Sequence, residues 1–128
     1  MNSVQLLGNL ARDPELRYTK TGKAVASFTV AATNSYVDSA TGEAKESTAF
    51  VACVAWGKMG EAVGALQKGS RVFVEGRLNT RSYEAQDGSK RYITEVVASF
   101  VGSSLTDTGS TAASNFDSFG GGEENVPF

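Results

Sequence analysis

The sequence predicts an all-β domain, because five segments rich in β-branched and aromatic residues lie between turn signals in its first hundred residues. One helical pattern lies between the third and fourth segments, where Met59, Val63 and Leu66 recur on a single helical face. Five strands with a helix in this place have the element order of an OB-fold, a five-stranded Greek-key barrel. The expected fold is therefore an OB barrel with one short helix between strands 3 and 4, followed by a C-terminal tail.

The first two strands are separated by a proline. The first strand is expected over residues 3–12 and ends before Pro14, which has no backbone N–H for a central ladder. Residues 16–19 are expected to resume pairing before a turn at residues 20–23. The second long strand covers residues 25–36, where small and apolar side chains alternate with serine and threonine.

The third strand follows a long polar segment, residues 37–48, which we expect to be a hairpin loop. Strand 3 covers residues 50–56, and alternation gives it one face of small side chains that suits a tight barrel core. Cys53, the only cysteine, lies on this face and is expected to be a core residue.

The last elements are a helix and two strands. The helix is expected over residues 57–68, although its two glycines weaken it by about 1 kcal/mol each relative to alanine, so it depends on packing. Gly69 is a typical C-terminal stop. Strands 4 and 5 are expected over residues 71–81 and 92–101, with a turn signal at Asp87-Gly88 between them.

The charges divide the chain into two parts. Residues 1–102, the expected OB domain, carry 12 basic and 10 acidic residues, whereas residues 103–128 carry no basic residue and four acidic ones. Serine, threonine and glycine dominate from Ser103 onward, so this segment buries too little apolar surface to offset its ordering entropy. We therefore expect residues 103–128 to be a disordered acidic tail that ends in an interaction motif.

The composition excludes several kinds of chemistry. The sequence has no histidine, which removes His-based metal sites and Ser-His or Cys-His catalysis, and a single cysteine forms no intrachain disulfide. It contains no P-loop, signal peptide or long apolar span. We expect a protein that is not an enzyme, needs no cofactor or metal, does not enter membranes and resides in the cytoplasm.

Two strands carry the candidate binding residues. Phe50 and Trp56 share one parity of strand 3 and lie about 20 Å apart along it, so on an outer face they form separate stacking platforms for bases. The alternative is that both rings belong to the core. On strand 4, Arg77, Arg81 and Tyr83 share one parity, which indicates a phosphate track ending in a ring. The alternative there is an ordinary solvated face.

These residues and others at the rims of the strands form one candidate surface. It consists of four aromatic and four basic residues: Tyr36, Phe50, Trp56, Tyr83, Lys58, Arg77, Arg81 and Arg91. Such a combination is typical of grooves that follow single-stranded nucleic acid. No helix carries a basic stripe for a major groove, so duplex readout is not predicted.

Several segments resemble the bacterial-type single-stranded DNA-binding proteins (SSB family) over about residues 2–102. They are Leu7-Gly8-Asn9-Leu10, Asp13-Pro14-Glu15-Leu16-Arg17-Tyr18, Val25-Ala26-Ser27-Phe28, Trp56-Gly57-Lys58, Lys68-Gly69-Ser70-Arg71-Val72-Phe73-Val74-Glu75-Gly76-Arg77-Leu78 and Arg91-Tyr92-Ile93-Thr94-Glu95-Val96-Val97. The terminus, Glu123-Glu124-Asn125-Val126-Pro127-Phe128, resembles the acidic tip of the same family.

The resemblance implies that Tyr36, Phe50, Trp56 and Tyr83 are the stacking residues. The family often has tryptophan at the first, second and fourth of these positions, so we expect weaker stacking per site here. The family also often places polar or basic residues directly after Phe50, where this chain has Val51 and Ala52.

The resemblance also implies a homotetramer whose first strands pair across an interface, and a nucleoid-associated role in DNA replication, recombination and repair. Replication and repair proteins would bind the terminal residues Glu123, Glu124, Val126, Pro127 and Phe128. For the tail, the alternative is a solubilising segment. For the whole protein, the alternative is an OB-fold protein-interaction module without a DNA role.

Overall fold

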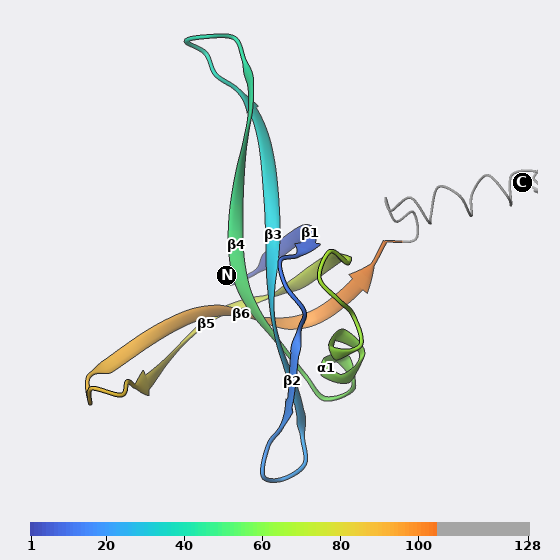
Figure 1. Cartoon of the computed structure of the whole chain (residues 1–128), viewed down its shortest axis with the longest axis vertical. Helices are drawn as coiled ribbons and strands as arrows, with labels where there is room; N and C mark the ends of the chain where they lie inside the picture. The colour runs from blue at the N-terminus through green and yellow to red at the C-terminus, as the bar shows by residue number, and fades with distance from the viewer. Residues whose placement is uncertain (105–128) are drawn as a thin grey trace, which may run out of the picture.

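The structure, a computed structural model, describes residues 1–104 and consists of six strands and one helix (Figure 1). These elements are β1 (Val4–Leu10), β2 (Glu15–Tyr18), β3 (Ala24–Val37), β4 (Ala44–Trp56), α1 (Gly57–Gly64), β5 (Arg71–Glu84) and β6 (Lys90–Ser103). The predicted fold class is confirmed. The short β2 is the pairing segment expected at residues 16–19, and Pro14 separates it from β1.

The sheet closes on itself to form a barrel. The strand order is β1-β5-β6-β4-β3-β2, and an additional antiparallel pairing joins β1 to β3 at Asn9↔Ala31 and Leu10↔Val30. Among the strands of residues 1–104, only the β4–β6 pairing is parallel. Gly8 allows the closure, because a Cβ at this position would collide with the carbonyl group of Ala31 on β3.

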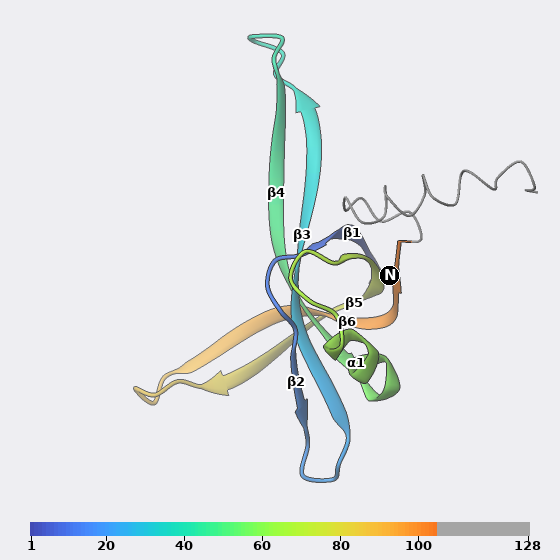
Figure 2. The ribbon, with the colours of Figure 1, turned by 45° about the vertical axis from the view of Figure 1, so that its right-hand side comes forward.

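Two long hairpins, β3–β4 and β5–β6, project from the barrel in different directions (Figures 1 and 2). The β3–β4 ladder continues to Val37↔Ala44, so the polar loop predicted for residues 37–48 is wrong in length. The residues near the hairpin's tip are exposed on both faces, and they therefore show no hydrophobic alternation although their backbones pair. The β5–β6 hairpin likewise extends past the predicted ends, from Glu84 to Lys90.

The helix is shorter than predicted, since it ends at Gly64 rather than residue 68. Gly64 lies against the side chain of Leu16, where a Cβ would come within 3.0 Å of it. Val63 is buried, and Met59 and Leu66 pack against the core as their spacing predicts. The helix thus closes one end of the barrel beside β3 and β4 (Figure 2).

The core consists of small and branched side chains from both sides of the barrel, together with the ring of Phe28. Its buried members are Leu10, Ala26, Phe28, Val30, Cys53, Ala55, Val63, Val72, Val74, Val96 and Ala98. Burial, together with the nearby Glu95 carboxylate, raises the pKa of the Cys53 thiol to about 12. Cys53 is therefore a neutral core residue, as predicted.

The described part ends just after β6. The strand continues to Ser103, one residue beyond the predicted domain boundary. The rest of the predicted tail, including Glu123, Glu124, Val126, Pro127 and Phe128, lies outside the described residues. Within residues 1–104, no helix is long and apolar enough to cross a membrane.

Candidate nucleic-acid interface

Four strands share one continuous outer face. The pairings Ser27↔Val54, Val54↔Val97 and Val97↔Arg77 join β3, β4, β6 and β5 in a single row. Directly paired residues point to the same side of a sheet, and side chains alternate along each strand. The outer face is therefore the side that carries this row, opposite the side occupied by Cys53 and Val96.

The two predicted stacking rings of β4 lie on the outer face. Phe50 and Trp56 have the same parity as Val54, and they are 69% and 41% exposed. Neither ring belongs to the core of the chain, so that alternative is wrong. Ala52 and Val54 lie between them and present small side chains, which leaves the rings accessible from the side.

The predicted residues of the second hairpin also lie on the outer face. On β5 these are Arg77, Arg81 and Tyr83, and on β6 Arg91 pairs directly with Tyr83. All four are exposed. The hairpin thus carries three guanidinium groups and one ring on the side that continues from Phe50 and Trp56.

Tyr36 lies on the reverse face of the β3–β4 hairpin. It pairs with Lys45, whereas Phe50 pairs with Ala31, five residues from Tyr36 and hence of opposite parity. The structure therefore brings three of the four predicted rings to one face and leaves Tyr36 on the other. Lys58, also exposed, lies beyond the strand in the first turn of α1.

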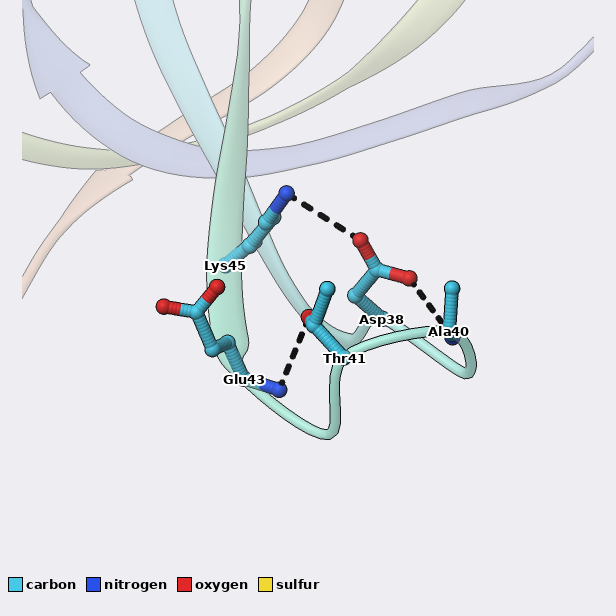
Figure 3. A network of polar contacts seen from close by, with 5 residues as sticks. All are labelled: Asp38, Ala40, Thr41, Glu43 and Lys45. Carbon is cyan, nitrogen blue, oxygen red and sulfur yellow. Dashed lines mark hydrogen bonds and ion pairs between the residues drawn. The ribbon is translucent and has the colours of Figure 1, made fainter.

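The tip of the β3–β4 hairpin is ordered by a small polar network (Figure 3). Asp38 accepts a hydrogen bond from the backbone N–H of Ala40 at 2.8 Å, and its other oxygen lies 3.1 Å from Lys45 Nζ. The Ala40 hydrogen bond, followed by the Lys45 contact, lowers the pKa of Asp38. The positive charge of Lys45, which pairs with Tyr36 in the ladder, is therefore balanced by the Asp38 carboxylate at the tip.

Two of the four predicted basic residues are paired with carboxylates. Arg81 Nε lies 3.0 Å from Glu95 Oε2, and Glu95 is the only buried charged residue in the described part of the chain. Arg91 lies 3.7 Å from Asp87, whose pKa is lowered by hydrogen bonds from Ser89. Lys58 and Arg77 form no ion pair with any residue in the range 1–104.

A cavity of about 300 Å³ opens on the outer face at the fork between the two hairpins. Thr29, Ala52 and Val54 line it on the β3–β4 side, and Arg81 and Glu95 line it on the other. Arg12 also lines this cavity and donates a hydrogen bond to Thr29 Oγ1 at 3.3 Å. Sequence reasoning missed Arg12 and Glu95, although the parity of β6 places Glu95 beside Arg91 on one face.

A third missed residue lies at the other end of the outer face. Lys23 Nζ lies 5.5 Å from the centroid of the Trp56 ring. Val25 is the direct partner of Trp56, and Lys23 lies two residues before Val25, so both side chains point to the same face as Trp56. The register of β3 therefore already indicates this contact. On the reverse face of the second hairpin, the exposed ring of Tyr92 has Lys90 Nζ at 6.0 Å from its centroid.

A family model named the single-strand binding protein family matches residues 1–104. The chain belongs to this family. Its members are binding proteins without catalytic activity, and membership therefore confirms that the protein is not an enzyme. Within residues 1–104 no group of three or more potential metal-ligating residues is found.

Two relatives agree with this membership. The single-stranded DNA-binding protein of Halalkalibacterium halodurans is 43% identical over 130 residues, which cover 99% of this chain and 75% of the relative. A crystal structure of a deletion mutant of the single-stranded DNA binding protein from Thermus aquaticus matches with a TM-score of 0.71 and 33% identity. The match covers 81% of this chain and half of the Thermus aquaticus chain.

Proposed function

We propose that the protein binds single-stranded DNA along its outer face, without strong sequence preference. One observation carries this proposal: Phe50 and Trp56 stand exposed on a single strand, next to a hairpin that presents Arg77, Arg81 and Tyr83 to the same side. Each base stacked on an aromatic ring contributes about 1–3 kcal/mol whatever its identity, because every base has a π-face. The names of the two relatives support the same ligand.

The electrostatic contribution to this binding is small. The two carboxylates that pair with Arg81 and Arg91 reduce the positive potential of the second hairpin. A phosphate track with few free cations gives modest affinity for each subunit. Stacking and the joint action of several subunits therefore supply much of the affinity.

We further propose that the subunits form a homotetramer in the nucleoid. Of the described residues, those at positions 4–8 of β1 pair only with β5, which leaves one strand edge open for a second copy. An apolar patch of Leu7, Phe73 and Phe100 lies beside this edge, with the two phenyl centroids 6.3 Å apart. An edge and a patch are two separate contact surfaces, which is what a tetramer of two-fold dimers requires.

In this role the protein would protect single strands from reannealing and from nucleases during replication, recombination and repair. The segment Glu123–Glu124 and Val126-Pro127-Phe128 would recruit replication and repair proteins, since carboxylates close to an aromatic ring suit a basic-rimmed pocket. The alternative, an OB-fold protein-interaction module without a DNA role, assigns the exposed rings to a protein partner instead.

A gel-shift comparison tests the proposal against this alternative. The full chain is mixed with oligo-dT, or with duplex DNA of the same length, at equal ionic strength. We expect a shifted band with oligo-dT at concentrations that leave the duplex free. Equal binding to both, or to neither, would contradict the proposal, and light scattering with and without poly-dT measures the subunit number.

A further inference from the structure

Lys23 and Trp56 meet at the end of the outer face that lies nearest to α1. The Lys23 ammonium is 5.5 Å from the centroid of the indole ring. A cation within about 6 Å of an indole centroid is attracted to the negative face of the ring. Because Trp56 remains 41% exposed, part of the ring stays accessible to a stacked base while the ammonium lies beside it.

The backbone of Lys23 is held in place by a tight turn. Its N–H donates to Thr19 Oγ1 at 3.0 Å, and its carbonyl accepts from the Thr19 N–H at 2.8 Å. Gly22 has a φ of 88°, a conformation that glycine adopts without strain. The base of the lysine is thus fixed at the start of β3, and only its side chain must be ordered to reach a ligand.

The Lys23 charge is not neutralised in the described part of the chain. The four ion pairs among residues 1–104 involve Arg17, Lys45, Arg81 and Arg91, and none of them includes Lys23. Arg17 lies in the same row as Trp56 through Val25, but its guanidinium is 2.6 Å from Glu15. Lys23 is therefore the unpaired cation beside the Trp56 ring.

We propose that Lys23 binds a backbone phosphate next to the base that stacks on Trp56. The ring and the ammonium then recognise the two chemical parts of one nucleotide unit, the π-face and the anionic backbone. This inference rests on the proposed function, and it adds a phosphate contact outside the second hairpin. The path of the single strand would consequently extend from the Arg77–Tyr83 segment across β4 to the turn before β3.

The sole tryptophan makes the test specific, because its fluorescence reports this end of the outer face alone. The full-length wild type and Lys23→Gln are titrated with oligo-dT over a series of salt concentrations. For Lys23→Gln we expect affinity at 0.1 M salt to fall about two- to fivefold. The slope of log K against log salt should become shallower by about 0.7 per bound subunit, as for the loss of one phosphate contact on a single strand.

Two controls separate a phosphate contact from a structural role. Lys20→Gln removes the same charge three residues away in the same turn and should change the slope by much less. Lys23→Arg keeps the charge and should keep the slope. Thermal unfolding should be unchanged in all three variants, because both lysines are exposed.

Each other outcome is informative. A Lys23→Gln slope equal to that of the wild type, or an increase in its affinity, overturns the inference while the proposed function stands. An increase in affinity would mean that the ammonium hinders stacking of a base on the Trp56 ring. A wild type that leaves oligo-dT unbound overturns the proposed function, and the phosphate contact with it.

Discussion

Arg81 Nε donates to Glu95 Oε2 at 3.0 Å, so a half-exposed guanidinium covers a carboxylate that is only 6% exposed. The pair joins β5 to β6 diagonally across the ladder, since Arg81 is the direct partner of Ile93. It also forms one wall of the cavity on the outer face. Arg81 therefore has a structural role in addition to any contact with a phosphate.

We predict that Arg81→Ala lowers the free energy of unfolding by about 1–3 kcal/mol, because it leaves a buried acceptor without its charged partner. Glu95→Gln should remove most of this penalty, so the double variant should be less destabilised than the sum of the two single variants. Urea unfolding of the wild type and of these three variants measures the coupling. Arg91→Ala is the matched control, since its partner Asp87 is exposed and no measurable loss is expected. Additive effects at Arg81 and Glu95 would show that the pair is uncoupled.

Trp56→Ala and Phe50→Ala should each weaken single-stranded DNA binding by about 1–3 kcal/mol, with similar losses for oligo-dT and oligo-dC. Both rings are exposed, so the unfolding free energy should change little. Tyr92→Ala provides the control: this ring is 68% exposed but lies on the reverse face of its hairpin. Fluorescence anisotropy of labelled oligonucleotides measures all three. An equal loss for Tyr92→Ala would indicate that the strand does not follow the outer face.

Tyr36 allows the path to be tested further, because it lies on the reverse face of the β3–β4 hairpin. A short oligonucleotide held on the outer face does not reach it, whereas a longer strand can pass around the hairpin. We predict that Tyr36→Ala leaves the affinity for a short oligo-dT unchanged and weakens binding of a long one. Anisotropy titrations at two lengths measure this, with Trp56→Ala as the variant that weakens both. A large loss on the short strand would place Tyr36 on the primary path.

The pKa of Cys53 predicts a pH dependence of stability. Its ordinary value is 9.0 and burial raises it to about 12, so the folded state favours the neutral thiol. The unfolded chain loses this proton at lower pH, and the associated stability is therefore fully present below pH 9 and is lost between about pH 9 and 12. Cys53→Ala should flatten this decrease, although the cavity lowers its stability at every pH.

Unfolding free energies measured from pH 8 to 11 for the wild type and Cys53→Ala give the comparison. The difference between the two curves removes the contributions of tyrosine and lysine, which both proteins share. The native wild type should also resist thiol alkylation at pH 8.5 until denaturant is added. Rapid alkylation of the native protein would show that Cys53 is not in the core.

The barrel was predictable because its strands bury one face, and Cys53 and Phe50 were assigned to opposite sides of β4 by alternation alone. The full length of the two long hairpins could not be predicted, since strands that are exposed on both faces show no hydrophobic alternation. Contacts such as Arg81–Glu95 depend on the β5–β6 register set by the turn between Glu84 and Lys90, and farther from the turn the register shifts once more at Glu75/Gly76. A sequence gives only a weak signal for such a β-bulge, although its one extra residue changes every pairing beyond it.

The last prediction concerns the terminus. Deleting Val126, Pro127 and Phe128 should leave oligo-dT affinity nearly unchanged, because the acidic residues and apolar side chains of this segment contribute no attraction to phosphates. The same deletion should abolish the recovery of partner proteins, since it removes the aromatic ring and the apolar side chains that a partner's pocket would bind. Pull-down with full-length and truncated protein measures recovery. A Phe128→Ala variant separates the effect of losing the ring from the effect of shortening the chain. If the truncated protein recovers the same partners equally well, the tail does not recruit them and the alternative of a solubilising segment holds.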